Sequence, residues 1–269
     1  MSTKNTTAII TGASSGIGAT YADRLAGRGY DVILVARNKE KLDAVAERIS
    51  KSHDVAVTVL TADLTTEADL TALEARLSGD ESISVLVNNA GFGGAGTLLE
   101  SDIGKMAEMI ATNVTAPTRL TYAVVPSMVK QGGGTIINIA SIVAIAPELL
   151  NGVYGGTKAY MLAFTQSLQH ELSAKGIRAQ AVLPGATSTE FWDVAGVGMG
   201  NLPSEWLMST ADLVDSALRG LDRQEKVTIP SLQDGAEWDA YETARQVMLP
   251  HLSNARPAPR YAGASERGV

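Results

Sequence analysis

A tyrosine and a lysine lie four residues apart in the stretch G-V-Y-G-G-T-K-A-Y, as Tyr154 and Lys158. This spacing puts both side chains on one face of a helix. The ordinary pKa of a tyrosine is about 10 and a nearby ammonium group lowers it, so the pair predicts a tyrosine that exchanges protons near neutral pH. Taken alone, the pair also fits an ordinary helix surface. Gly155 and Gly156, which lie between the two residues, each weaken a helix by about 1 kcal/mol.

A serine, Ser141, directly follows the apolar run T-I-I-N-I-A. If that run is a strand, the serine hydroxyl lies at its carboxyl end, where it would donate a hydrogen bond to an oxygen that gains negative charge. A serine that only turns the chain is the alternative. Reduction of a ketone needs a hydride from a cofactor, a proton and a group that stabilises the oxyanion. Tyr154 and Ser141 are candidates for the last two functions.

The cofactor signal is the stretch T-G-A-S-S-G-I-G, residues 11–18, between a predicted strand and a predicted helix. Glycines at Gly12, Gly16 and Gly18 permit a tight turn and close approach of the backbone to a pyrophosphate. The free N–H groups of the helix N-terminus attract the same anion. Ser14 and Ser15 add hydroxyl donors, and Ile17 lies in the same loop. The pattern predicts dinucleotide binding, although an ordinary strand-to-helix turn has similar glycines.

The residues after the second predicted strand indicate which dinucleotide binds. An acidic residue at the strand end would bond the adenosine ribose 2′-hydroxyl of NAD, whereas an arginine suits the 2′-phosphate of NADP. Here the strand ends V-A-R-N, with Ala36 where the acid would be, followed by Arg37 and Asn38. A guanidinium group offers several donors to a phosphate. The sequence therefore predicts that NADP(H) is preferred over NAD(H).

Short β-branched runs alternate with longer helical segments along the chain, and this pattern predicts an α/β fold with a doubly wound parallel sheet. The predicted strands are 7–11, 31–36, 55–61, 83–88, 135–140, 177–183 and 226–229. The predicted helices are 16–28, 39–51, 67–77, 102–129, 152–175 and 210–221. We expect one domain over 1–255, a substrate flap near 190–209, and a flexible tail at 256–269, which is rich in Pro, Gly and Ser.

Composition limits the classes of partner. The 269 residues carry a net charge of −7, which argues against a broad nucleic-acid surface. The absence of cysteine and the wide separation of the three histidines predict no metal site. No segment is long and apolar enough to span a membrane, so we expect a cytoplasmic protein that acts on a small molecule.

These motifs together resemble the classical short-chain dehydrogenase/reductase family, in its NADP-preferring branch. The resemblance covers about 6–189 and rests on T-G-A-S-S-G-I-G, Asp63-Leu64, N-N-A-G at 88–91, Asn113, Ser141, Y-G-G-T-K and P-G-A-T-S-T. It implies a single Rossmann-type domain with a seven-stranded parallel sheet in the order 3-2-1-4-5-6-7 and helices on both faces.

The resemblance also implies roles for individual residues. Asp63 and Leu64 would contact the adenine, and Asn113 would hold a water that relays protons to Lys158. Lys158 would bond the nicotinamide ribose. The other positions implied to line the cofactor are Asn89, Ala90, Gly91, Pro184, Gly185, Thr187 and Thr189.

An apolar segment follows P-G-A-T-S-T and predicts a flap over a lipophilic ketone or secondary alcohol. Its candidate substrate residues are Phe191, Trp192, Met199 and Trp206. Ile142 is a further candidate, and residues 147–153, with Glu148, would line the opposite wall. Ordinary core packing is the alternative for each apolar residue.

Other functions remain as alternatives. The chain is also similar to hydroxysteroid-type dehydrogenases and to reductases of 3-oxoacyl groups on a carrier protein or CoA, although F-G-G-A-G after N-N-A-G departs from the carrier-protein type. A non-catalytic NADP-sensing regulator would not need Tyr154. By analogy with the family, helices 102–129 and 152–175 would assemble a homodimer or homotetramer.

Overall fold

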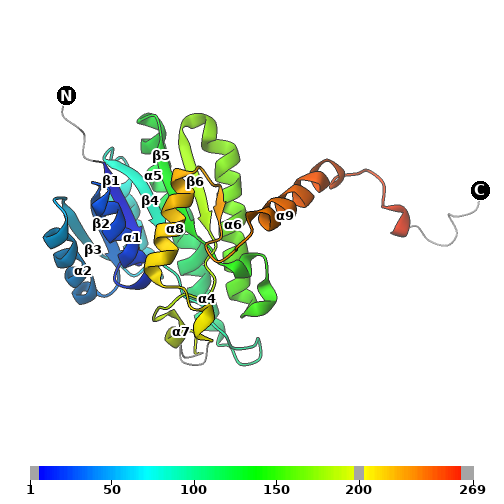
Figure 1. Ribbon diagram of the computed structural model, residues 1–269, viewed down its shortest axis with the longest axis horizontal. Coiled ribbons are helices and arrows are strands. Elements are labelled where there is room, and N and C mark those ends of the chain that lie inside the picture. Colours follow the sequence, from blue (N-terminus) through cyan, green and yellow to red (C-terminus); the bar gives the residue numbers. More distant parts are fainter. Residues whose placement is uncertain (1–5, 197–202, 262–269) are drawn as a thin grey trace, which may run out of the picture. The chain divides into compact units, whose positions relative to one another are not determined.

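Seven parallel strands form the centre of the structure, a computed structural model that describes residues 6–196 and 203–261. The strands are β1 (Thr7–Thr11), β2 (Asp31–Ala36), β3 (Val57–Thr61), β4 (Ile83–Asn88), β5 (Gly134–Ile139), β6 (Ile177–Val182) and β7 (Val227–Thr228). Their order is β3-β2-β1-β4-β5-β6-β7, which confirms the predicted sheet (Figure 1). The strands β1, β2, β4, β5 and β6 are largely buried on both faces, as parallel strands are when helices cover them.

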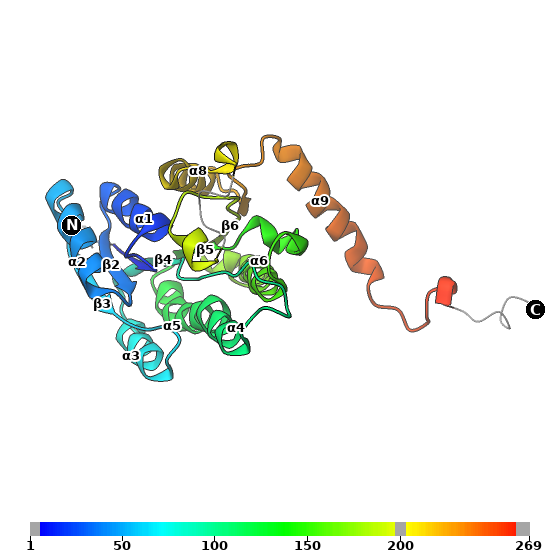
Figure 2. The same ribbon diagram turned by 90° about the horizontal axis from the view of Figure 1, so that it is seen from below.

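Helices cover both faces of this sheet (Figure 2). Side chains of α1 (Gly16–Gly27), α2 (Lys39–Ser52) and α8 (Thr210–Asp222) join one apolar core with the strands. Side chains of α3 (Glu67–Leu77), α5 (Ala116–Lys130) and α6 (Gly152–Leu172) join a second core on the other face. The result is the three-layered, Rossmann-type arrangement expected from the alternation of strands and helices.

The chain changes its direction of winding at β1, which pairs with β2 on one side and with β4 on the other. In an open parallel sheet, ligands bind outside the carboxyl ends of the strands at such a switch point. The glycine loop follows β1, and the N-N-A-G motif spans the end of β4. The topology therefore brings both motifs to one crevice.

A buried polar ladder fixes α6 against the sheet. The Asn88 side-chain amide at the end of β4 donates to the Asn138 side-chain oxygen on β5 over 2.9 Å, and the Asn138 amide donates to the Thr165 hydroxyl on α6 over 2.9 Å. Buried polar groups need such partners, so a shift of α6 along the sheet would leave amides unsatisfied. The ladder thereby helps to set the position of Tyr154 and Lys158.

The single helix predicted over 102–129 is wrong in one respect, because a π-helical segment interrupts it. The structure has α4 (Ile103–Ile110), the π segment Ala111–Thr115, and α5. The Ala116 N–H bonds to the carbonyl of Ala111, five residues earlier. Pro117 has no N–H, so it cannot give the Asn113 carbonyl its usual α-helical hydrogen bond. π segments of this kind are frequent at functional sites.

The two glycines between Tyr154 and Lys158 have different surroundings. A Cβ atom on Gly155 would lie 3.1 Å from the Pro147 Cβ and 3.2 Å from its Cα, whereas a Cβ on Gly156 would meet nothing within 4 Å. Gly155 is therefore needed for the close approach of the segment before α6, and Gly156 is not.

We expect Gly156→Ala to raise the free energy of unfolding by about 0.5–1 kcal/mol, because alanine favours a helix and the site is open. Gly155→Ala is expected to lower it by about 1 kcal/mol, since Pro147 must move. Chemical denaturation of both variants measures the difference, and equal shifts would contradict the assigned role of Gly155.

The chain divides into two compact units at Ser231, rather than near residue 255 where the sequence places the domain end. The second unit contains α9 (Gly235–Met248), a helix that the sequence reading did not include, and no residue of this described helix is buried. Within the predicted tail, Pro259–Tyr261 forms a short 3-10 turn, and 262–269 lies outside the described residues.

Candidate active site

A cavity of about 600 Å³ lies at the carboxyl ends of strands β1 to β6. It brings together most of the site residues that the sequence predicts. Those that line it are Gly12, Ser14, Ser15, Gly16, Ile17, Arg37, Asn38, Asp63, Leu64, Asn89, Ala90, Gly91, Ser141, Ile142, Tyr154, Lys158, Pro184, Gly185, Thr187, Thr189, Phe191, Trp192 and Trp206. Among the described residues, Gly18, Asn113 and Glu148 do not line it, and Met199 lies outside the described ranges.

The glycine loop has a backbone that only glycine adopts readily. Gly12 and Gly16 have φ angles of +67° and +54°. A Cβ on Gly12 would lie 2.7 Å from the Asn89 side-chain nitrogen, and a Cβ on Gly18 would lie 2.3 Å from the Gly12 carbonyl oxygen. Gly18 therefore permits close packing of α1 on the loop, while Gly12 and Gly16 shape the cavity wall.

The N-terminus of α1 is prepared for an anion. Among the described residues, Ser15 at the N-cap makes no side-chain capping hydrogen bond, and the first turn holds no acidic residue. The N–H groups of that turn are therefore available to a phosphate, as they are in other dinucleotide sites. The loop and this helix end fit the pyrophosphate of a nicotinamide dinucleotide.

The N-N-A-G motif braces the glycine loop as well as lining the cavity. The Asn89 side-chain amide donates to the Thr11 carbonyl over 2.9 Å, and the N–H groups of Asn89 and Ala90 both donate to the Thr11 hydroxyl over 3.0 Å. These bonds tie the end of β4 to the end of β1. The implied role of Asn89 in lining the cofactor is thus combined with a structural one.

Charged groups gather near the ends of β2 and β3. Arg37 is exposed, and its charge acts on Asp63. Burial raises the pKa of Asp63, but hydrogen bonds from Thr65 and the charge of Arg37 outweigh that effect and lower it. The Asp63 carboxylate is therefore ionised and held by Thr65, which leaves the Arg37 guanidinium at the cavity wall for another acceptor.

Tyr154 and Lys158 lie in the first two turns of α6, both about 6% exposed. The Lys158 ammonium is 5.7 Å from the centre of the Tyr154 ring and donates to the Ile139 carbonyl at the end of β5 over 2.8 Å. Burial disfavours its charge and lowers the pKa of Lys158 to about 8.

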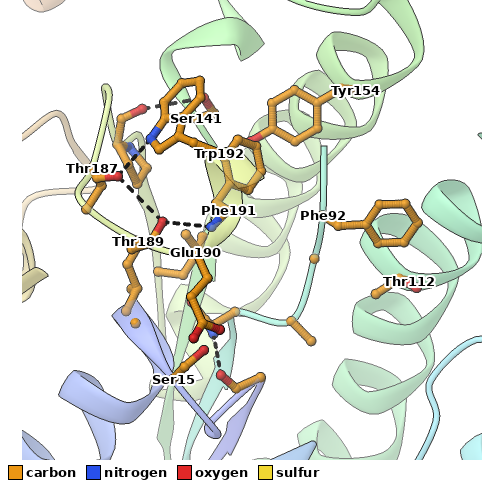
Figure 3. A pocket seen from close by; sticks show the side chains of 18 of the residues that line it. Ser15, Phe92, Thr112, Ser141, Tyr154, Thr187, Thr189, Glu190, Phe191 and Trp192 are labelled. Atoms are coloured by element: carbon orange, nitrogen blue, oxygen red, sulfur yellow. Dashed lines mark hydrogen bonds between the residues drawn. The ribbon is translucent and has the colours of Figure 1, made fainter. Parts of the chain in front are cut away.

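The pKa of Tyr154 differs from the expectation that Lys158 lowers it. Burial raises the pKa of Tyr154 to about 12, and the effect that opposes burial is a hydrogen bond with Ser141. Removal of the phenol from water disfavours its anion more than the lysine at this distance favours it. The structure therefore holds Tyr154 as a protonated phenol next to Ser141 (Figure 3).

Ser141 lies just past the carboxyl end of β5, with Ala140 between them, and begins a short 3-10 turn. Its hydroxyl accepts a hydrogen bond from the Val143 N–H over 3.3 Å and lies 3.4 Å from the Pro184 carbonyl, to which it donates. The serine is thus both a turn residue and a wall residue of the cavity. The two roles considered for Ser141 from the sequence, a hydrogen-bond donor at the site and a turn residue, are therefore compatible.

Asn113 lies in the π segment, and its buried side chain bonds to the backbone of Phe92, next to the cavity. The side-chain oxygen accepts from the Phe92 N–H over 3.1 Å, and the amide donates to the Phe92 carbonyl over 2.9 Å and to the Thr157 hydroxyl over 3.1 Å. These bonds use the side chain fully. The part of Asn113 that is left for a water is its backbone carbonyl, because Pro117 cannot donate to it.

The far end of the cavity is apolar. The Phe191 ring contacts the Tyr154 ring with centroids 5.6 Å apart and meets Trp192 edge to face at 5.3 Å (Figure 3). Trp192 is anchored by a hydrogen bond from its indole nitrogen to the Thr187 carbonyl over 2.8 Å. These contacts support the predicted wall at Phe191 and Trp192.

Several wall residues were not singled out from the sequence. Near 147–153, Leu149 and Leu150 line the cavity in place of Glu148. An irregular segment has no periodic pattern, so its sequence does not predict which side chains face the cavity. Further wall residues include Phe92, Thr112, Val143, Lys41 and Glu190. Phe92 directly follows N-N-A-G, which is the signal that could have identified it.

Neither a metal nor a membrane signal accompanies this cavity. The described part of the chain contains no group of three or more His, Asp or Glu side chains arranged to hold a metal ion. Within 6–196 and 203–261, none of the helices has the length and apolar character that crossing a bilayer requires.

The fold and the cavity define a dinucleotide-binding oxidoreductase of the Rossmann type. The chain belongs to the short-chain dehydrogenase family, whose model matches residues 6–196. A solved short-chain dehydrogenase from Sphingobium yanoikuyae in complex with NADPH is 49% identical with a TM-score of 0.91, covering 95% of this chain and 100% of the other.

Two further relatives differ more. The bulky-bulky ketone specific alcohol dehydrogenase from Comamonas testosteroni is 43% identical with a TM-score of 0.88, covering 97% of this chain and 100% of its own. Human 17-beta-hydroxysteroid dehydrogenase type 3 is 36% identical over 186 residues, which are 68% of this chain and 59% of the human protein.

Proposed function

We propose that this protein is an NADP(H)-dependent oxidoreductase that interconverts a bulky lipophilic ketone and the corresponding secondary alcohol. The observation that carries the proposal is that one cavity joins the glycine loop to a protonated Tyr154 and Ser141 beside an apolar wall. NADPH, when bound, supplies the hydride. The glycine loop, Arg37 and the Pro184–Thr189 segment would hold it, since they line the half of the cavity that begins at α1.

The residues of the chain would supply the rest of the reaction. Ser141 donates a hydrogen bond to the substrate oxygen and stabilises the negative charge that develops there. Tyr154 gives its proton to the same oxygen. A phenol with a pKa near 12 is already protonated at neutral pH, so reduction can begin without a preceding proton transfer to the tyrosine.

Lys158 and Asn113 would restore the proton. The Lys158 ammonium, 5.7 Å from the tyrosine ring, stabilises the phenolate that forms. We assign Asn113 the role of holding, through its backbone carbonyl, a water on the path from Lys158 to solvent. Its side chain keeps the π segment in place through Phe92 and Thr157.

The shape of the apolar wall supports a substrate with large groups. The wall is built from Phe92, Val143, Leu149, Leu150, Phe191, Trp192 and Trp206. The Comamonas relative is named for bulky-bulky ketones, and the human relative for hydroxysteroids. A hydroxysteroid or a 3-oxoacyl thioester is therefore the second candidate, and a regulator that only senses NADP is the remote one.

A ketone panel tests this proposal, with NADPH oxidation as the measurement. We expect kcat/KM for ketones with two large apolar substituents to exceed that for sugar ketones by about 100-fold or more. Preference for a 3-oxoacyl-CoA would move the assignment to the second candidate. The absence of turnover with every class, while NADPH binds, would favour the regulator.

Arg37→Ala is expected to reduce the preference for NADP. Loss of the guanidinium should raise KM for NADPH about tenfold or more, because a charge-assisted bond to the 2′-phosphate disappears. KM for NADH should change little, and it serves as the internal control. An unchanged ratio of kcat/KM for the two cofactors would rule out Arg37 as the selecting residue.

We also propose that the protein is cytoplasmic and forms a homodimer or homotetramer through α4, α5 and α6. Exposed apolar side chains on the first two helices, Ile103 and Tyr122, support such packing. A monomer in sedimentation velocity would overturn the assembly.

A further inference from the structure

An ion pair lies at the wall of the cavity. The Lys41 ammonium on α2 donates to both carboxylate oxygens of Glu190, over 2.9 Å each, and both residues line the cavity. Glu190 directly precedes Phe191, whereas Lys41 lies in the first turn of α2. The pair therefore links the start of α2 to the segment that leads into Phe191.

The Glu190 carboxylate has the partners that a phosphate oxygen would have. Besides Lys41, it hydrogen-bonds with Ser15 at the N-cap of α1, and these contacts lower the pKa of Glu190. Figure 3 shows the Glu190 carboxylate close to Ser15. The Ser15 hydroxyl and the Lys41 ammonium lie at the ends of two helices, α1 and α2, where anions are stabilised. A carboxylate in that position stands in for an anionic group of the cofactor.

The position of Lys41 is not explained by helix stability. A cation in the first turn of a helix is disfavoured by the helix dipole. The Asn38 side chain accepts a hydrogen bond from the Lys41 N–H over 2.9 Å, so the cap holds this residue next to Arg37 and Asn38. A lysine at this place fits an anion in front of the helix.

The pair can also open easily. The side chains of Lys41 and Glu190 are 47% and 63% exposed. An ion pair this exposed contributes little to stability, because water replaces most of what is lost when it breaks. A phosphate with two negative charges is a stronger partner for an ammonium than one carboxylate is.

We propose that Lys41 and Glu190 form a latch that is specific for the 2′-phosphate of the cofactor, an inference that rests on the proposed NADP preference. In the free protein Glu190 holds Lys41. When a 2′-phosphate binds beside Arg37, the Lys41 ammonium moves from Glu190 to the phosphate, and the Glu190 side chain turns out of the cavity. Lys41 thereby adds to the selection of NADP(H), and Glu190 limits its affinity by competing for Lys41.

The test measures the Kd of NADPH and of NADH for the full-length protein and its variants by fluorescence titration. We expect Lys41→Gln to weaken NADPH binding about tenfold and to change NADH binding by less than about twofold. Glu190→Gln should tighten NADPH binding about threefold, because Lys41 is then free. Lys39→Gln is the matched control. Lys39 lies two residues before Lys41 and pairs with Asp43, so this variant removes the same charge without touching the latch.

The double variant separates the latch from simple repulsion. If Glu190 acts through Lys41, the gain from Glu190→Gln disappears when Lys41 is already glutamine. If the gain persists, Glu190 only repels the phosphate and the latch is wrong. If the parent protein prefers NADPH and Lys41→Gln binds NADPH as tightly as the parent does, the latch is wrong but the proposed NADP preference stands. If the parent binds NADH as tightly as NADPH, both the proposed preference and the latch are wrong.

Discussion

Tyr154→Phe is expected to lower kcat by about a thousandfold or more, because reduction loses its proton donor. The Kd of NADPH should stay within about twofold, since the ring and its contact with Phe191 are kept and only the hydroxyl next to Ser141 is lost. Loss of the buried hydroxyl removes its hydrogen bond with Ser141, which should lower the free energy of unfolding by only about 1 kcal/mol, so the variant should still fold. Steady-state turnover and cofactor titration of the purified variant measure both effects.

Tyr160→Phe is the matched control for this variant. Tyr160 lies on the same helix, and its hydroxyl hydrogen-bonds with Thr118 over 2.7 Å, away from the cavity. Loss of that hydroxyl should leave kcat within about twofold of the parent value. Full turnover of Tyr154→Phe would remove Tyr154 as the proton donor, and an equal loss in both variants would indicate damage to α6 rather than to the chemistry.

Lys158→Met is expected to lower kcat by about 100-fold or more, because the phenolate that forms on Tyr154 loses its neighbouring positive charge. In the parent protein, burial lowers the pKa of Lys158 to about 8. The ammonium is therefore present below that pH and lost above it. Turnover of the parent in the reduction direction should fall as pH rises through about 8, and this decline should be absent in the variant.

The same lysine should make stability increase with pH where turnover decreases. The pKa of Lys158 is about 8 in the folded protein and 10.5 for a lysine in water, so the unfolded chain binds more protons between these two pH values. Stability of the parent should therefore rise with pH across that window and lose this contribution as pH falls through 8. Denaturation of parent and variant at several pH values measures it. A parent whose stability does not rise, or a variant with unchanged kcat, would contradict the role of a buried charged lysine.

The sequence predicts the fold well where the signal is local. Each strand is a short apolar run bounded by turn residues, and their alternation with helices dictates parallel pairing. The motif residues Gly12, Ser141 and Tyr154 follow strands or begin helices, so the topology alone brings them to one edge. This is why most of the predicted site lines one cavity.

Features that depend on tertiary contacts could not be predicted in this way. The π segment at Asn113 keeps an almost helical periodicity, so the sequence predicts an unbroken helix there. The pKa of Tyr154 depends on burial as well as on its distance from Lys158, and spacing along a helix gives only the second. Leu149 and Leu150 replace Glu148 in the wall because a 3-10 turn, rather than a regular element, sets their direction.

Hydride transfer to a bulky ketone is the central claim, and isotope transfer measures it most directly. The protein is mixed with NADPH in which both hydrogens of the reactive nicotinamide carbon are deuterium, and with a ketone that carries two large apolar substituents. The mass of the alcohol product is then determined, with Tyr154→Phe in parallel. We expect the parent protein to form an alcohol that carries one deuterium transferred from NADPH, and Tyr154→Phe to form almost no alcohol. An alcohol without deuterium, or equal yields from both proteins, would contradict it.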